Sequence, residues 1–293
     1  MTTSSGLDKA DQLEFKDTQN KTFTGHPTGT TCRPDFTAAF HSDWRGDIPW
    51  PFIQLAGKKA SAGEPPKSQE LHAISYLHYL LLARPDLHIA QGLLTTNSKI
   101  TFFLGTGGVG VQKFSVKWDD KDLYQLLFAF IYRLYVPANF ADPSYIKADF
   151  DTETSGATYT IRITVTQPQG STQEINCSGF NHIYARKPFA TCTHVFSNPK
   201  SEAKDGVVVI KDQLCRVGRH FDELKILKRV HRSGRVPGVV NAKYGEVVMT
   251  PQSLKGEGMC KRHLALSELG SPFTSIPTLQ KMLETLFDLL EGI

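Results

Sequence analysis

A lysine and a glutamate in the second half of the chain have the spacing to form an ion pair. Lys211 follows an apolar strand pattern in Val207–Gln213 (VVVIKDQ), and a helical pattern follows in Gly218–His231. The apolar stripe expected for this helix consists of Phe221, Leu224, Leu227 and Val230. Glu223 lies at the edge of that stripe, so it can reach Lys211 if the helix packs against the sheet that contains the strand. An ammonium group held in this way can bind phosphate oxygens.

The segments around this pair resemble the small lobe of a protein kinase. The run VVIK at Val208–Lys211 is similar to the V-A-I-K of the third kinase strand. Glu223–Val230 (ELKILKRV) has the E-x-x-I-L-x-x-V pattern of the helix that follows that strand. The later segments keep the same order, with Val236–Val240 similar to a fourth strand, His263–Ser267 to a fifth, and Glu268–Gly270 to a hinge.

The resemblance implies a nucleotide site. In kinases the strand lysine contacts the α- and β-phosphates of ATP, and the helix glutamate holds its ammonium group. The resemblance gives these roles to Lys211 and Glu223 and puts Ser267 at the gatekeeper position. It also implies that the hinge backbone from Glu268 to Gly270 binds adenine.

Segments along most of the chain together resemble the fungal-type protein kinase family, in which an N-terminal α/β domain precedes a kinase domain. The resemblance covers roughly residues 31–293, and the order of the motifs is more specific than any one of them. They are RPDF (33–36), HYLLLARPD (78–86), GLL (92–94), KWDDKDLYQLLFAFIYRLYVP (117–137) and VVIKD (208–212). This resemblance implies phosphorylation of protein hydroxyl groups with ATP and Mg²⁺ as cofactors.

The sequence departs from an active kinase at the phosphate loop. The segment Ile183–Phe196, where a glycine-rich loop is expected, contains no glycine. Glycines let backbone amides approach phosphates, so phosphate binding is expected to be weak. The family's G-R-x-T element is reduced to Ala190 and Thr191, which leaves Thr191 as a further nucleotide-binding candidate.

The sequence also lacks the motifs of phosphate transfer. It contains no D-F-G, and its only His-Arg pair in the second half, His231-Arg232, lies at the end of the predicted helix and is followed by Ser233. We therefore predict no catalytic and no metal-binding residue. The expected function is that of a truncated or degenerate kinase, in which phosphate transfer by this chain alone is not expected.

A final helical pattern in Pro277–Ile293 resembles the kinase helix that precedes the catalytic loop, and the large lobe is expected to be essentially absent. The helix carries an apolar stripe: Leu279, Met282, Leu283, Leu286 and Leu290. An apolar stripe of this kind, if exposed, indicates a protein partner.

The N-terminal half supports an alternative reading. Pro34-Asp35, a strand ending in Ala56-Gly57-Lys58 and a helix from about Gln69 resemble the layout of restriction-endonuclease-like folds. Such sites hold Mg²⁺ with an Asp and a Glu beside a Lys. Because Ala56 stands at the Glu position, we expect no cleavage. The alternative function is a non-enzymatic protein-interaction or nucleic-acid-binding module.

The predicted fold class is α+β, with an N-terminal mixed α/β domain followed by a small lobe made of a five-stranded antiparallel sheet and one helix. The predicted divisions are a disordered lead-in at 1–30, the first domain at 31–175, the small lobe at 176–270, and the hinge exit with the final helix at 271–293. The main elements predicted in the first domain are a strand at Pro49–Ala56, helices at Gln69–Ala83 (capped by Ser68) and Leu123–Tyr135, and strands at Ile100–Leu104, Gly110–Trp118 and Ala157–Thr166.

Composition and charge limit the kinds of partner and the cellular locations that the sequence supports. The net charge of +4 is too small to indicate a nucleic-acid partner, and the basic run on the Glu223 helix, from Lys225 to Arg235, is expected to be a solvated face. The apolar runs are too short and too interrupted for a membrane span. Five cysteines without paired spacing indicate reduced thiols in an intracellular protein.

Overall fold

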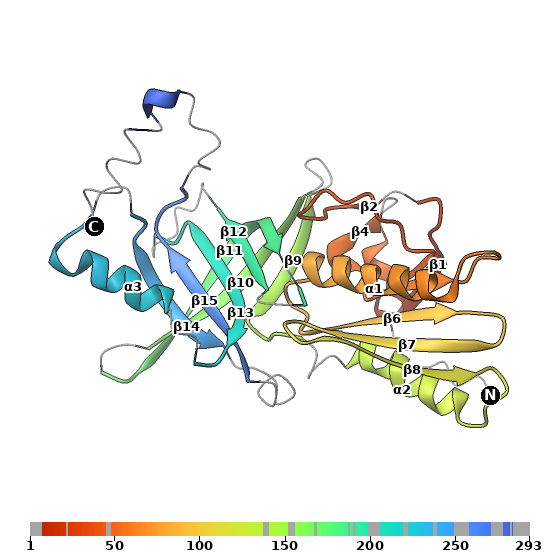
Figure 1. Cartoon of the computed structure of the whole chain (residues 1–293). Helices are drawn as coiled ribbons and strands as arrows, with labels where there is room; N and C mark the ends of the chain where they lie inside the picture. The colour runs from red at the N-terminus through yellow and green to blue at the C-terminus, as the bar shows by residue number, and fades with distance from the viewer. Residues whose placement is uncertain are drawn as a thin grey trace.

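The computed structural model describes residues 8–21, 23–44, 48–136, 141–151, 156–166, 169–186, 188–189, 192–198, 206–218, 222–236, 239–248, 258–270, 278–281 and 283. The protein is a mixed α/β structure with two large sheets (Figure 1). The predicted combination of helices and sheets is therefore confirmed at this coarse level.

The first sheet has six strands in the order β1-β3-β5-β6-β7-β8. Its strands are β1 (Leu13–Asp17), β3 (Phe36–Phe40), β5 (Leu55–Lys59), β6 (Ile89–Thr95), β7 (Lys99–Thr106) and β8 (Gly110–Lys117). Only β5 and β6 pair in parallel, because the chain crosses between them through helix α1 (Pro66–Ala83). All other neighbours in this sheet are antiparallel.

Two helices cover opposite faces of the first sheet. Helix α1 packs with Leu94 and Phe103, whereas helix α2 (Leu123–Tyr135) packs with Leu93 and Phe102. Consecutive strand residues point to opposite faces, so these neighbouring positions define the two layers. Helix α1 begins at Pro66, before the predicted Ser68 cap, because proline is well suited to the first helical turn.

The second sheet has seven strands in the order β14-β15-β13-β12-β11-β10-β9, and every pairing is antiparallel. Its strands are β9 (Tyr145–Asp151), β10 (Gly156–Thr166), β11 (Thr172–Arg186), β12 (Thr193–Ser197), β13 (Val209–Arg216), β14 (Ala242–Val248) and β15 (Met259–Leu266). Helix α3 (Glu223–Val230) follows β13 and packs against β14.

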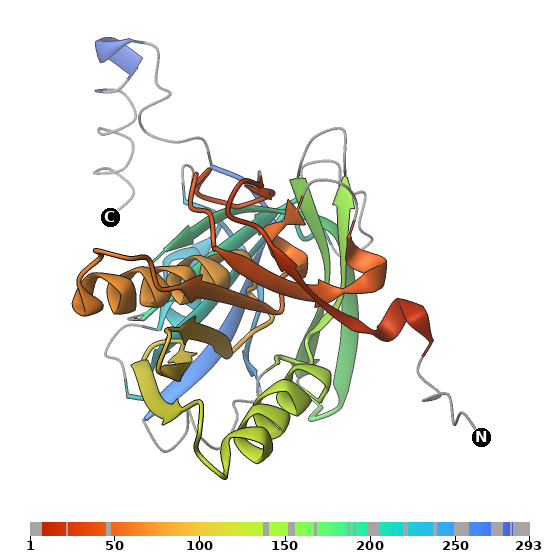
Figure 2. The same cartoon turned by 90° about the vertical axis from the view of Figure 1, so that its right-hand side faces the viewer.

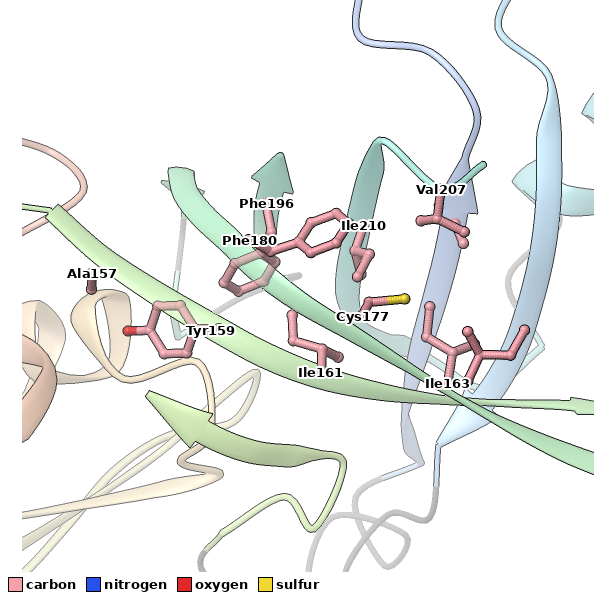
Figure 3. Packing of buried hydrophobic residues seen from close by; sticks show 11 residues of the cluster. Ala157, Tyr159, Ile161, Ile163, Cys177, Phe180, Phe196, Val207 and Ile210 are labelled. Carbon is pink, nitrogen blue, oxygen red and sulfur yellow. The ribbon is translucent and has the colours of Figure 1, made fainter. Parts of the chain in front are cut away.

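The second sheet curves around its own apolar core. The side chains of Tyr159, Ile161, Phe180 and Phe196 gather between the strands and are buried (Figure 3). The curvature brings β10 close to β14, where the backbone N–H of Thr164 donates a 2.8 Å hydrogen bond to Glu246 Oε2. Because the curved sheet supplies both sides of this core, α3 is left to cover only part of the outer face.

Short elements complete the described chain. They are the strands β2 (Phe23–Thr24) and β4 (Ile48–Pro49), which pair in parallel, and the 3₁₀ helices η1 (Lys9–Asp11), η2 (His41–Asp43), η3 (Trp50–Phe52) and η4 (His231–Ser233). None of the helices within the described ranges is both long and apolar enough to cross a membrane.

The structure differs from the sequence prediction near the N-terminus. Part of the predicted disordered lead-in forms β1, which pairs with β3 at the edge of the first sheet, because Leu13 can bury itself beside the α2 core. The predicted strand Pro49–Ala56 is instead divided among three elements: Pro49 ends β4, Trp50–Phe52 form η3, and Leu55 and Ala56 begin β5. Prolines at 49 and 51 explain this difference, since they cannot donate to a sheet ladder.

A second difference concerns β9 and β10. They fall within the stretch predicted as the N-terminal domain, yet they pair into the second sheet and extend the predicted five strands to seven. Helix α3 begins at Glu223, later than the predicted Gly218 start, because the side chain of Asp222 caps it by accepting from the Lys225 N–H at 3.2 Å.

Candidate functional site

The lysine and glutamate singled out in the sequence are in contact. Lys211 Nζ lies 2.9 Å from Oε1 and 2.7 Å from Oε2 of Glu223, so both carboxylate oxygens accept from the ammonium group. Lys211 comes from the middle of β13 and Glu223 is the first residue of α3. Both side chains are partly exposed, so a ligand can reach the ammonium group.

The position of α3 is fixed by its cap and by its apolar side. Asp222 accepts from Arg262 Nη1 of β15 at 3.0 Å, which ties the start of the helix to the sheet. Leu227 is buried together with Val209 and Leu264 of the sheet. These contacts hold the N-terminal end of α3 against the sheet, so that Glu223 lies opposite Lys211.

A cavity of about 330 Å³ lies beside the ion pair, between α3 and strands β13, β14 and β15. Glu223, Leu224 and Ile226 line it from the helix, and Cys215, Val247 and Leu264 are among its strand residues. Its size is at the lower end of the range for small-molecule sites. The cavity therefore offers room next to Glu223, with mainly apolar walls.

The predicted hinge residues follow the end of β15. Ser267 donates from both its N–H and its hydroxyl group to the carbonyl oxygen of Asn241, at 3.1 and 3.3 Å. Glu268 Oε1 forms an ion pair of 2.5 Å with Arg235 Nη2. Gly270 is exposed, and Thr191 lies outside the described residues. The amide of Ser267, the predicted gatekeeper residue, is thus bonded within the protein.

A second polar cluster, which sequence reasoning missed, lies on the opposite face of the second sheet. Lys261 Nζ of β15 is 2.6 Å from Asp142 Oδ2 and 2.9 Å from Asp212 Oδ2, and all three side chains are buried. The Tyr145 hydroxyl donates to the same Asp212 oxygen. His263 lies 3.8 Å from Asp212 and 3.3 Å from Glu246. We call these six residues the Lys261 cluster.

The Lys261 cluster keeps its charges because opposite charges meet inside the protein. Burial alone would lower the pKa of Lys261, but the carboxylates of Asp142 and Asp212 hold that pKa above its ordinary value. Burial acts against His263 as well, yet the nearby carboxylates of Asp212 and Glu246 raise the pKa of His263 to about 9. Both cations are therefore protonated at neutral pH.

Three residues of the cluster could in principle hold a metal ion. Ligand atoms of Asp142, Asp212 and His263 lie within 4.8 Å of one another. The Lys261 ammonium group, however, already contacts both carboxylates and neutralises them. Within the described ranges, this cluster is therefore a charge network centred on Lys261.

The Lys261 cluster also connects the two sheets. Lys261 Nζ donates to the Pro85 carbonyl oxygen at 3.0 Å, just after the end of α1. The Asp142 N–H donates to the Asp86 carbonyl at 2.7 Å, and the Tyr159 hydroxyl donates to the Ala83 carbonyl at 3.1 Å. The cluster, together with Tyr159, therefore connects the second sheet to the C-terminal end of α1.

A cysteine and a histidine near the cluster lie at a distance typical of a catalytic pair. Cys192 Sγ lies 3.2 Å from His194 Nε2, and both residues are buried. Burial raises the pKa of the Cys192 thiol to about 12 and lowers the pKa of His194 to about 4. A thiol with so little thiolate at neutral pH is not an activated nucleophile.

The N-terminal motif residues also meet. Lys58 Nζ at the end of β5 lies 3.2 Å from Asp35 Oδ2 and 3.4 Å from Glu64 Oε2, and Lys58 is buried. Ala56 occupies the position where the resemblance implies a glutamate, and it is buried. Glu64 was not singled out in the sequence, because it lies in the loop before α1 and outside the motif spacing.

Only part of the predicted final helix falls within the described residues. Leu279 and Leu283 belong to its predicted apolar stripe and are exposed. Met282, Leu286 and Leu290 lie outside the described residues. The basic run on α3 is solvated at Lys225, Lys228 and Arg229, as the sequence predicts.

The chain matches no protein-family model, no curated protein and no solved structure.

Proposed function

We propose that the second sheet and α3 form a degenerate protein-kinase-like small lobe of the fungal-type protein kinase family, which binds the phosphates of ATP through Lys211. The chain order β11, β12, β13, α3, β14, β15 supports this proposal, since a helix follows the third of five antiparallel strands. The added strands β9 and β10 extend the sheet at the far edge from α3 and leave the five-strand part intact.

The two-oxygen contact between Lys211 and Glu223 is the observation that carries the proposal. The side chain of an unpaired lysine samples many positions. The Lys211 ammonium group, by contrast, is held by the two carboxylate oxygens of Glu223, at 2.9 and 2.7 Å. A held cation with an exposed side can bind an anionic phosphate without first paying to order its side chain. This arrangement is the one that phosphate binding in kinases uses.

The proposal is limited to binding. Kinases hold Mg²⁺ with carboxylate and amide oxygens close to the phosphates. Of the acidic residues next to Lys211, Asp212 points to the opposite face and is bound to Lys261, while Glu223 is bound to Lys211 itself. These residues do not fit a metal site beside the phosphates, so we derive no transfer step through Mg²⁺.

The test is a thermal-shift titration with ATP, run with Mg²⁺ and separately with a chelator. We expect ATP to raise the melting temperature of the wild type and to have a much smaller effect on Lys211→Ala. Lys225→Ala is the matched control, because Lys225 lies on the same helix as Glu223 and its side chain is 84% exposed. No shift of the wild type at millimolar ATP, or equal shifts in all three proteins, would contradict nucleotide binding.

A second candidate is a non-enzymatic nucleic-acid-binding module built on the first sheet. The contact between Asp35 and Lys58 favours it, since a restriction-endonuclease-like site needs these two groups side by side. Retention on immobilised DNA and RNA at increasing salt concentration is the measurement, because phosphate contacts weaken steeply with salt. We expect Lys58→Ala to elute at a lower salt concentration than Lys113→Ala, which is a surface control on β8. Elution of both variants and the wild type at the same salt concentration would argue against this function.

A further inference from the structure

Helix α2 carries a row of exposed aromatic side chains along its outer side. Tyr124 is 81% exposed, Phe128 71% and Tyr132 51%. These residues are four positions apart, so they form one straight row on the helix surface. In both views α2 lies at the lower edge of the molecule (Figures 1 and 2). All three side chains of the row are therefore at least half exposed.

The inner side of α2 is apolar as well. Leu123, Phe130 and Leu134 are buried against the first sheet. A helix that is apolar on both sides is normally covered on both sides. An exposed apolar row of this size on a soluble protein indicates an interaction surface.

We propose that two copies of this chain associate through α2, with the two helices packed antiparallel about a two-fold axis at Phe128. The exposed row supports a second copy of the chain as the partner, because the row is symmetrical about Phe128. An antiparallel pairing sets Tyr124 of one subunit against Tyr132 of the partner subunit, and the reverse contact forms at the other end. A two-fold axis requires a surface that is complementary to itself in this way.

The neighbouring row on α2 provides the groove that such a pairing needs. Ala129 lies next to Phe128, between Gln125 and Arg133, and is exposed. Helices pack when the ridge of one enters the groove of the other, and a small residue opens that groove. The Phe128 ring can therefore lie over Ala129 of the partner subunit.

Charge also favours an antiparallel second copy. Arg133 is exposed near the C-terminal end of α2, and the exposed charges at its N-terminal end are three aspartates (Asp119, Asp120, Asp122) and two lysines (Lys117, Lys121), a net charge of −1. Antiparallel packing brings each Arg133 beside the acidic end of the other helix, and it opposes the two helix dipoles favourably. Parallel packing would bring like charges together.

The same charges disfavour a lipid surface as the occupant. Helices that lie on membranes usually carry several Lys or Arg residues on their polar face. The exposed side of α2 has one arginine, and its N-terminal end has three aspartates and two lysines, Lys117 and Lys121. With an exposed net charge of about zero, this helix lacks the basic face that an anionic bilayer attracts.

Sedimentation velocity over a range of protein concentrations tests the proposal. We expect the wild type to form a dimer reversibly, and Phe128→Glu to remain a monomer with an unchanged circular dichroism spectrum. Leu71→Glu on α1 is the matched control, because Leu71 is 56% exposed and lies on the helix that covers the opposite face of the same sheet. This control should dimerise like the wild type.

A charge exchange tests the orientation of the helices. Arg133→Glu should weaken dimerisation by about tenfold, since two exposed ion pairs are lost per dimer. Adding Asp122→Arg to the same chain should restore it. Asp122 suits this exchange because its side chain forms no capping hydrogen bond. Two results would overturn the proposal. One is a wild type that stays monomeric at all concentrations, whether or not it binds lipid vesicles. The other is a Phe128→Glu variant that dimerises like the wild type.

Discussion

Lys211 and Asp212 are consecutive residues of β13 whose side chains point to opposite faces of the second sheet. Lys211 pairs with Glu223 of α3 at 2.7 Å, while Asp212 pairs with Lys261 of β15 at 2.9 Å. The alternation of side chains along a strand separates the two pairs. One strand thus supplies both an accessible cation and a buried anion.

The buried cation of the Lys261 cluster should be essential for stability. Lys261→Met leaves the carboxylates of Asp142 and Asp212 buried without their partner, and breaking such a pair costs about 3–5 kcal/mol. Chemical denaturation measures the free energy of unfolding. Lys225→Met, on the exposed face of α3, should change it by less than about 0.5 kcal/mol. Similar losses in both variants would show that the cluster is not stabilising.

Stability should fall in alkaline solution because of His263. Its pKa is raised from 6.5 to about 9 in the folded protein by Asp212 and Glu246, against the effect of burial. The folded state therefore binds this proton more tightly, and the contribution is complete below pH 6.5 and is lost as the pH rises through about 9. We expect a loss of about 3 kcal/mol between these limits. In His263→Gln, denaturation curves at pH 6 and pH 9.5 should differ less than in the wild type.

The Cys192 thiol should be unreactive in the native protein. Burial raises its pKa to about 12, and burial raises the pKa of Cys32 to about 11. Mass spectrometry after timed alkylation at pH 8 should show Cys192 labelled more slowly than Cys32, which is only partly buried. Both should be labelled rapidly in denaturant. Fast native labelling of Cys192 would mean that His194 activates it.

Gly57 should not tolerate a side chain. A Cβ at this position would lie 2.1 Å from Cζ of Phe36, whose ring packs on β5. The ring and the strand would have to move apart, and overpacking of this kind costs about 1–3 kcal/mol. Gly270→Ala is the control, since no heavy atom lies within 4 Å of its new Cβ. Equal melting temperatures for the two variants would contradict the close packing of Phe36 on Gly57.

Local patterns in the sequence were sufficient for several features of this protein. The apolar run that ends at Lys211 and the helical period of α3 predicted that Glu223 could reach Lys211, because both residues belong to consecutive elements joined by a short connection. The same kind of reasoning predicted most of α1 and the full extent of α2. It also singled out Asp35, which precedes β3, and Lys58, which lies in the neighbouring strand β5.

The tertiary structure decided what depends on distant segments. Asp142, Asp212 and Lys261 come from a loop and two strands with no shared motif, so nothing local in the sequence indicates that they meet. The same holds for β1 at the edge of the first sheet and for β9 and β10 in the second. Such contacts form because burying apolar strands and pairing buried charges lowers the free energy of the whole fold, and this condition is met only when all its elements are assembled.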